Sequence, residues 1–120
     1  MDSLVSTQWL ADTLGARDLR VLDATLVAGD GDRDAAAEFA AGHIPGAQFL
    51  DLASLRDTDD PLPNMLPAPE NTVARLRKLG VGDGDRIVLY DDSPWRTAAR
   101  AWFVLRAAGI RNLAVLDGGL

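Results

Sequence analysis

The sequence predicts an α/β domain: a doubly wound parallel sheet with helices on both faces. Short apolar segments alternate along the chain with segments in which apolar residues recur at the spacing of a helix. This is the pattern of strands joined by crossover helices. The apolar runs at residues 87–90 and 113–116 are unbroken, as expected of strands that helices cover on both sides. The length of 120 residues, with 48% apolar and 25% charged residues, indicates one domain of ordinary globular composition.

Helix and strand alternate in the first half of the chain. Ser6 can cap a helix amino terminus, and Gly15 stands where that helix would end. The predicted elements are a helix at 6–14, a strand at 19–22, an alanine-rich helix at 34–41 and a short strand at 48–50. Residues 57–69 contain four prolines and three aspartates without periodicity, so a loop is predicted there.

The second half repeats this alternation. The predicted elements are a helix that opens at Pro69 and closes at Gly80, a strand at 87–90, a helix at 96–108 and a strand at 113–116. Gly80 stands where a left-handed helix cap is favoured. The charged residues of the helix at 96–108 are Arg96, Arg100 and Arg106, which cover about a third of its surface. We therefore expect the rest of this helix to be buried.

Composition excludes several classes of function. Twelve basic against eighteen acidic residues give a net charge of −6, which disfavours binding to nucleic acid or to anionic membranes. The chain has no cysteine and one histidine, so we expect no disulfide, no cysteine nucleophile, no thiolate or multi-histidine metal site and no cofactor. Residues 29–34 imitate the start of a calcium loop, but Ala35 and Ala41 stand where that loop needs glycine and a bidentate acid.

The sequence shows no targeting or membrane-spanning segment. No apolar run approaches the roughly 20 residues of a membrane-spanning helix, and the amino terminus has no basic segment followed by an apolar stretch. We therefore expect a cytoplasmic protein with no membrane partner.

Every predicted strand is followed by an acidic residue. These residues are Asp23, Asp51, Asp91 with Asp92, and Asp117. In an open parallel sheet the ligand crevice lies beyond the carboxyl ends of the strands. Two interpretations stay open: the carboxylates cap turns and helix amino termini, or they rim a crevice that repels small anions unless arginines compensate.

The segment 91–96 links a buried strand to a buried helix, and such a loop can cradle an anion with its backbone N–H groups. Its first position, where a nucleophile would stand, holds Asp91. We interpret Asp91 as a capping or anion-excluding acid rather than as a catalyst. Ser93 is a weak nucleophile candidate, because the one histidine comes from a different loop.

The segment 42–47 is a turn rich in glycine that presents His43 in a defined direction. Its imidazole can shuttle protons near neutral pH, or it can hold two loops together by hydrogen bonds. We favour the hydrogen-bonding role, with Asp32 or Asp34 as the local partner.

Residues 33–47, which end in His-Ile-Pro-Gly-Ala, resemble the first signature of the rhodanese family of sulfurtransferases. The segments 21–24, 64–67, 80–91 and 116–119 follow in the order and spacing of the amino-terminal half of two-domain thiosulfate and mercaptopyruvate sulfurtransferases. The resemblance implies that residues 1–120 form a single rhodanese-like domain, one half of a two-domain protein. It also implies a closing helix after Gly119 that this chain lacks.

The resemblance further implies a partner, the carboxy-terminal catalytic rhodanese domain. A cysteine there would take sulfur as a persulfide from a small sulfur-containing anion, thiosulfate or 3-mercaptopyruvate, and pass it to cyanide or a thiol. Asp91 matches the position of that cysteine, so this half is expected to be inactive alone. Four residues match positions that support the site: His43, Asp32, Asp34 and Arg100. The alternative is a stand-alone inactive rhodanese-like module that binds a protein partner.

Overall fold

The computed structural model describes residues 4–25, 35–51, 69–82, 84–91 and 97–116. These residues form a five-stranded sheet in the order β1-β5-β4-β2-β3, and every neighbouring pair is parallel. The strands are β1 (Leu4–Val5), β2 (Leu19–Asp23), β3 (Gln48–Phe49), β4 (Arg86–Tyr90) and β5 (Leu113–Leu116). The predicted doubly wound α/β class is confirmed.

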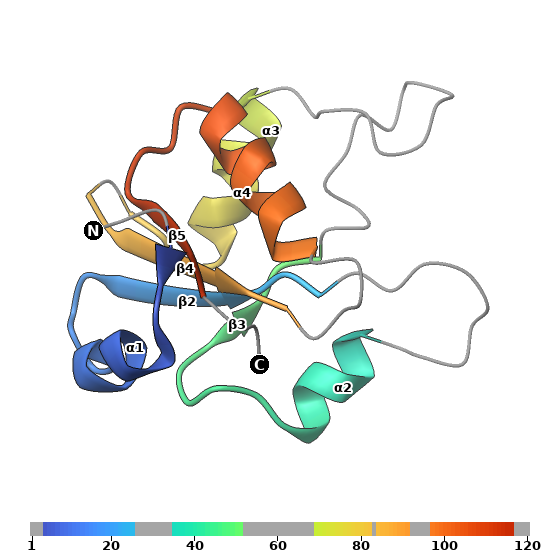
Figure 1. The fold of residues 1–120 in the computed structure, drawn as a ribbon. Coiled ribbons are helices and arrows are strands. Elements are labelled where there is room, and N and C mark those ends of the chain that lie inside the picture. The colour runs from blue at the N-terminus through green and yellow to red at the C-terminus, as the bar shows by residue number, and fades with distance from the viewer. Residues whose placement is uncertain (1–3, 26–34, 52–68, 83, 92–96, 117–120) are drawn as a thin grey trace.

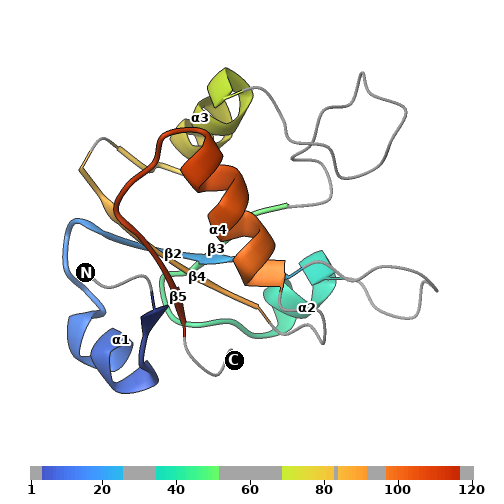
Figure 2. The ribbon, with the colours of Figure 1, turned by 45° about the horizontal axis from the view of Figure 1, so that its top comes forward.

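Helices cover both faces of the sheet (Figures 1 and 2). They are α1 (Thr7–Thr13), α2 (Ala35–Ala41), α3 (Pro69–Lys78) and α4 (Thr97–Ala107). Figure 1 shows α3 and α4 together on one face of the sheet, and α1 and α2 on the other face. Of the latter two helices, α2 is the nearer to the carboxyl ends of β2 and β4. Among the described residues no helix has the length and apolar character needed to cross a bilayer.

The central strand β4 supplies side chains to both cores. Ile87 and Leu89 pack in the cluster with α3 and α4, whereas Val88 and Tyr90 pack in the cluster with α1. This alternation follows from the period of two along a strand. All four side chains are buried, which explains why this run carries no charged residue.

The predicted helix ends at Ser6 and Gly80 are confirmed. The Ser6 hydroxyl accepts a hydrogen bond from the Trp9 backbone N–H at 3.0 Å and caps α1. At the end of α3, Gly80 adopts a φ of +81°, and its N–H donates to the Arg77 carbonyl at 3.0 Å. A side chain at this φ would be strained, which is why glycine suits the position.

Two features differ from the prediction. The strand β1, which pairs with β5 through Leu4 and Val115, was not predicted, because two residues are too few to show a periodicity. The expectation that α4 is buried apart from its arginines is wrong, since Phe103 is 51% exposed. One side of α4 packs on the sheet and α3, and the opposite side meets solvent whether or not it is charged.

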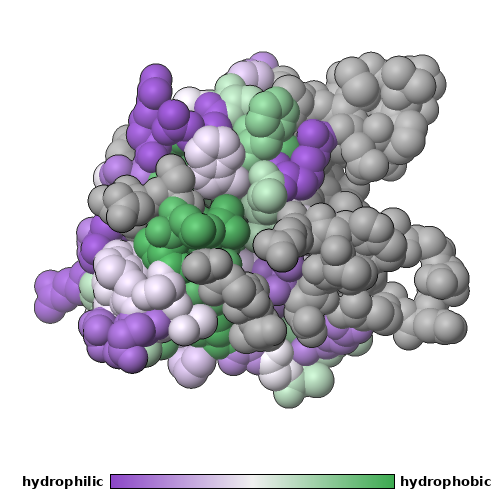
Figure 3. Space-filling view, in the orientation of Figure 1, coloured by the Kyte–Doolittle hydropathy of each residue, from purple (hydrophilic) through white to green (hydrophobic). Residues whose placement is uncertain are grey.

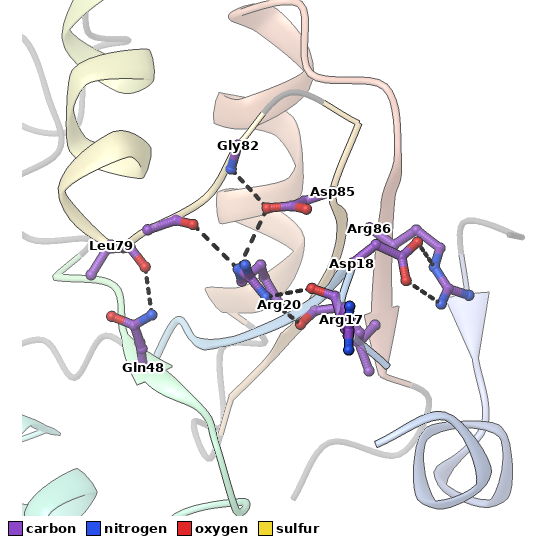
Figure 4. Close-up of polar contacts among 10 residues, drawn as sticks. Arg17, Asp18, Arg20, Gln48, Leu79, Gly82, Asp85 and Arg86 are labelled. Carbon is purple, nitrogen blue, oxygen red and sulfur yellow. Dashed lines mark hydrogen bonds and ion pairs between the residues drawn. The ribbon is translucent and has the colours of Figure 1, made fainter. Parts of the chain in front are cut away.

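Polar contacts fasten the amino-terminal ends of β2 and β4 (Figure 4). Arg86 donates two hydrogen bonds to the Asp18 carboxylate, at 2.8 and 2.9 Å, and this guanidinium lowers the pKa of Asp18. Arg20 lies 3.4 Å from the Asp85 carboxylate, which also accepts from the Gly82 N–H at 2.7 Å. The candidate site lies at the opposite end of the sheet, at the carboxyl ends of these strands.

Candidate functional site

The carboxyl ends of β2 and β4 lie side by side and form the floor of the candidate site. Asp23 pairs in register with Tyr90, and the Ala24 N–H donates to the Tyr90 carbonyl at 2.8 Å. The Leu50 N–H donates to the Asp23 carbonyl at 2.9 Å, which brings in the end of β3. The structure thus places strand-end acids at one edge, as the parallel sheet predicts.

Asp23 is a buried turn-capping acid. Asp23 is only 6% exposed. Its Oδ1 accepts hydrogen bonds from the Thr25 N–H at 2.9 Å and from the Thr25 hydroxyl at 2.6 Å. This pattern, a carboxylate bonded to the backbone two residues on, is an Asx turn. Of the two interpretations of the strand-end acids, capping is therefore confirmed at Asp23.

Asp91 is bonded to the amino-terminal turn of α4. It is 8% exposed, and its Oδ2 accepts from the Ala98 N–H at 2.6 Å. The N–H groups of a first helical turn have no partner within the helix, and the helix dipole favours a negative charge there. Nearby, the Thr97 hydroxyl donates to the Ala24 carbonyl at 2.8 Å, which ties α4 to β2. The capping interpretation of Asp91 is confirmed.

His43 is exposed, and it is fixed by the helix that precedes it. Its Nδ1 lies 2.7 Å from the Phe39 carbonyl oxygen, and its ring lies over the Phe39 ring with 3.9 Å between centroids. Phe49 meets Phe39 edge to face at 5.7 Å. Since a carbonyl oxygen only accepts, Nδ1 must carry a proton, so the neutral imidazole keeps its lone pair on Nε2.

The partner found for His43 differs from the partners proposed for it. Asp32 and Asp34 lie outside the described residues, so their contact with His43 stays a prediction. The Phe39 carbonyl was not foreseen, and because every residue carries a backbone carbonyl, the identity of residue 39 does not predict this bond. A phenylalanine four residues before a histidine at a helix end is a visible signal for the ring contact alone.

The turn after His43 packs against the sheet. The Ala47 N–H donates to the Ile44 carbonyl at 2.9 Å, and Gly46 takes a φ of +80°, which closes a tight turn. Ala47 is buried in the same cluster as Tyr90, and Ile44 packs against that cluster. The backbone that follows His43 is therefore held in place by its packing against the sheet.

Tyr90 is a site residue that the sequence reasoning missed. It is fully buried at the end of β4, it pairs in register with Asp23, and its hydroxyl has no hydrogen-bond partner among the described residues. Burial, with the charge of Asp23, raises the pKa of Tyr90 to about 12. The hydroxyl is therefore a proton donor at neutral pH. A tyrosine ending an otherwise aliphatic strand was the available signal.

The remaining predicted residues are only partly placed by the structure. Arg100 lies half-buried in the first turn of α4. Asp51 is exposed after β3, and its carbonyl accepts from Arg75 at 3.1 Å. Asp92, Ser93 and Asp117 lie outside the described residues. Among the part of the chain that is described, no group of three potential metal ligands occurs.

Known proteins match this chain along almost its entire length. Residues 6–120 match the family described as the rhodanese-like domain. The chain is 39% identical over 97% of its length to the 3-mercaptopyruvate sulfurtransferase of Escherichia coli K12, and it spans 42% of that relative. It is 39% identical over 98% of its length to the thiosulfate sulfurtransferase of Gallus gallus, again spanning 42%.

A solved structure agrees with this match. The crystal structure of SseA from Escherichia coli, described as a 3-mercaptopyruvate sulfotransferase with the rhodanese fold, superposes with a TM-score of 0.91 at 38% identity. The superposition covers 100% of this chain and 46% of that one. The chain thus spans less than half the length of these relatives. With its five parallel strands and its histidine turn, the chain belongs to the rhodanese-like family, as a domain homologous to the amino-terminal domain of 3-mercaptopyruvate sulfurtransferases.

Proposed function

We propose that this chain is the amino-terminal, non-catalytic half of a sulfurtransferase, which moves sulfane sulfur from thiosulfate or 3-mercaptopyruvate to cyanide or a thiol. One observation carries the proposal. At the head of the loop between β4 and α4, where a nucleophile would stand, the Asp91 carboxylate accepts the Ala98 N–H at 2.6 Å. With no cysteine in the chain, the nucleophile must come from a carboxy-terminal catalytic rhodanese domain.

In this proposal, both steps of sulfur transfer take place at the cysteine of that partner domain. Its cysteine thiolate attacks the outer sulfur of thiosulfate, the S–S bond breaks, and sulfite leaves with the bonding pair. With 3-mercaptopyruvate the C–S bond breaks instead, and the leaving enolate takes up a proton to become pyruvate. Cyanide or a thiolate then attacks the outer sulfur of the persulfide and releases the cysteine thiolate.

The contribution of this chain is then to position the donor and to supply a proton. His43 is exposed and its Nδ1–H is held by the Phe39 carbonyl, so the lone pair on Nε2 can take up a proton and pass it to the enolate. We assign Asp32 and Asp34 a supporting role at the same site, as acids close in sequence to His43. Arg100 is a permanent cation on α4. Its positive charge reduces the repulsion that acids such as Asp23 and Asp91 exert on an anionic sulfur donor.

The proposal is tested by mixing this chain with a cysteine-bearing carboxy-terminal half and measuring pyruvate or sulfite release. We expect sulfur transfer above that of the carboxy-terminal half alone. The variant His43→Gln should lose the gain, whereas Gln8→Ala, an exposed change on α1, should keep it. No gain at saturating concentrations of the chain would contradict the proposal.

A second candidate function is a stand-alone module that binds a protein partner. Figure 3 shows apolar surface over the β1 and β5 edge of the sheet, where Leu4 is 56% exposed, and such surface favours protein contact. The intact mass of the native polypeptide separates the two. A mass near twice 12.8 kDa or more supports the sulfurtransferase half, and a mass near 12.8 kDa supports the module.

A cytoplasmic location belongs to the same proposal. One relative, from Arabidopsis thaliana, has a name that places it in mitochondria. Fractionation of the source cell, followed by immunodetection of the chain, tests the location directly.

A further inference from the structure

We propose that Phe49 is a positioning residue for His43 and that it acts through the ring of Phe39. Three aromatic rings lie in sequence from the sheet to the imidazole: Phe49 on β3, Phe39 on α2 and His43 just after α2. The functional meaning of this arrangement rests on the proposed function, in which His43 supplies a proton. The arrangement itself is a property of this chain and can be tested without any sulfur chemistry.

Phe39 gives the imidazole a polar contact and a ring contact. Its carbonyl oxygen lies 2.7 Å from Nδ1, and its ring lies over the imidazole with 3.9 Å between centroids and 38° between planes. Phe39 and His43 are four residues apart, and the Gly42 N–H still donates to the Glu38 carbonyl at 3.1 Å. The helical geometry that brings such side chains together therefore extends past the end of α2. The orientation of the imidazole thus depends on where Phe39 lies.

The hydrogen bond alone restrains the imidazole weakly. His43 is exposed, so water can replace the Phe39 carbonyl as the partner of Nδ1–H, and the net contribution of such a bond is small. The Phe39 ring restricts the imidazole in a second way, because it covers one of the two faces. This restriction is effective only if the Phe39 ring is itself held in place.

Phe49 connects the Phe39 ring to the sheet. The two rings meet edge to face at 5.7 Å and 86°, which is a favoured geometry for an aromatic pair. Phe49 pairs in register with Asp23, and the next N–H, that of Leu50, donates to the Asp23 carbonyl at 2.9 Å. By contrast, none of the α2 side chains that the structure describes is buried, and Phe39 is the largest of them. Phe49 therefore links a fixed strand to the residue that orients His43.

The composition of the chain supplies matched variants. The sequence has one histidine and three phenylalanines, so the His43 signals need no assignment by mutation, and each change of phenylalanine to leucine is chemically the same. We would record long-range ¹H–¹⁵N spectra of neutral His43, which report how the proton is shared between Nδ1 and Nε2. The samples are the wild type, Phe39→Leu, Phe49→Leu and the double variant. The control is Phe103→Leu, which changes an exposed phenylalanine on α4, across the sheet from α2.

We expect Phe49→Leu to shift the His43 nitrogen signals toward the Nε2–H tautomer, because Phe39 loses its lateral contact and its carbonyl binds Nδ1–H less often. In the background of Phe39→Leu the same change should cause no further shift, since the ring that transmits the effect is already absent. Phe103→Leu should leave the signals unchanged. The inference is overturned if Phe49→Leu superposes on the wild type, if it shifts the signals equally in both backgrounds, or if Phe103→Leu shifts them as much.

Nuclear Overhauser effects in the wild type give a second test that needs no variant. The centroid distances of 3.9 and 5.7 Å bring ring protons of each pair close enough for such effects. We expect them between the rings of His43 and Phe39 and between those of Phe39 and Phe49. The absence of either set would overturn the inference.

Activity then separates this inference from the proposed function. In mixtures with the carboxy-terminal half, we expect Phe49→Leu to lower kcat several-fold with little change in KM, because a misplaced imidazole weakens the proton step. Phe103→Leu should keep both constants. A tautomer shift with unchanged kcat would support the positioning of His43 and contradict its role in catalysis. A loss of kcat without a tautomer shift would overturn the positioning and leave the proposed function standing.

Discussion

At the scale of single residues, the Asp91 carboxylate links the chemistry of the site to the stability of the fold. It is buried and accepts the Ala98 N–H at 2.6 Å, so Asp91→Ala leaves a helix N–H without its acceptor. We expect a loss of about 2 kcal/mol in the free energy of unfolding, measured by urea denaturation. Asp91→Asn keeps an acceptor oxygen without the charge and should lose less. Equal stability of Asp91→Ala and the wild type would contradict the capping assignment.

The raised pKa of Tyr90 predicts a dependence of stability on pH. The pKa rises from 10.0 to about 12 on folding, so the folded state binds this proton more tightly than the unfolded state does. The stabilisation is complete below pH 10 and is lost as the pH rises toward 12. Its upper bound is about 3 kcal/mol, reduced by solvent screening near the sheet end. Urea denaturation of the wild type and Tyr90→Phe at pH 8 to 11.5 should show the steeper decline in the wild type, and parallel curves would count against it.

The site residues that sequence could predict are those whose role is local. His43 stands in a turn motif, and Asp91 follows directly on an apolar run, so both were found from neighbouring residues. Tyr90 and Phe39 were missed as site residues because their roles depend on which atoms come together in space. Tyr90 acquires its role from the register of β4 with β2, and no spacing along the chain encodes that register.

At the scale of elements, the glycines that follow α2 and α3 give a matched pair of variants. Gly80 has a φ of +81°, whereas Gly42 after α2 is outside the left-handed region, and a Cβ at either position would meet no atom within 4 Å. Gly80→Ala should therefore destabilise the fold by about 1 kcal/mol through backbone strain alone. Gly42→Ala should be neutral or stabilise by about 0.5 kcal/mol, because it restricts the unfolded chain. Thermal unfolding followed by circular dichroism compares them, and equal effects would refute the strain argument.

The elements themselves were predicted closely because each carries its own signals. Ser6 and Gly80 mark helix ends by hydrogen bonding and by φ, and the unbroken run of β4 marks a strand covered on both faces. The order β1-β5-β4-β2-β3 was not predicted. Sheet order depends on where each crossover returns, and β1, with two residues, is defined by its pairing with β5 rather than by its own sequence.

At the scale of the whole molecule, one sheet serves two cores, and this predicts that both layers unfold together. Trp9 packs against the core on the side of α1, and Trp102 packs against the core formed with α3 and α4. Both cores include residues of β2, β4 and β5, so neither can lose its packing without exposing strands that the other needs. A single cooperative transition is therefore expected.

The two tryptophans allow this prediction to be measured. The chain has three tryptophans, so replacing Trp95 and one of the others by phenylalanine leaves a single reporter for one layer. We expect the variant that keeps Trp9 and the variant that keeps Trp102 each to show a fluorescence transition with the same midpoint as its own circular dichroism transition. A fluorescence midpoint at lower urea in one variant would show that its layer opens first. If the variant that keeps Trp9 opens first, the histidine turn, which packs on that side through Ile44, would be mobile in a domain whose other layer is intact, and a fixed imidazole could not be its native state.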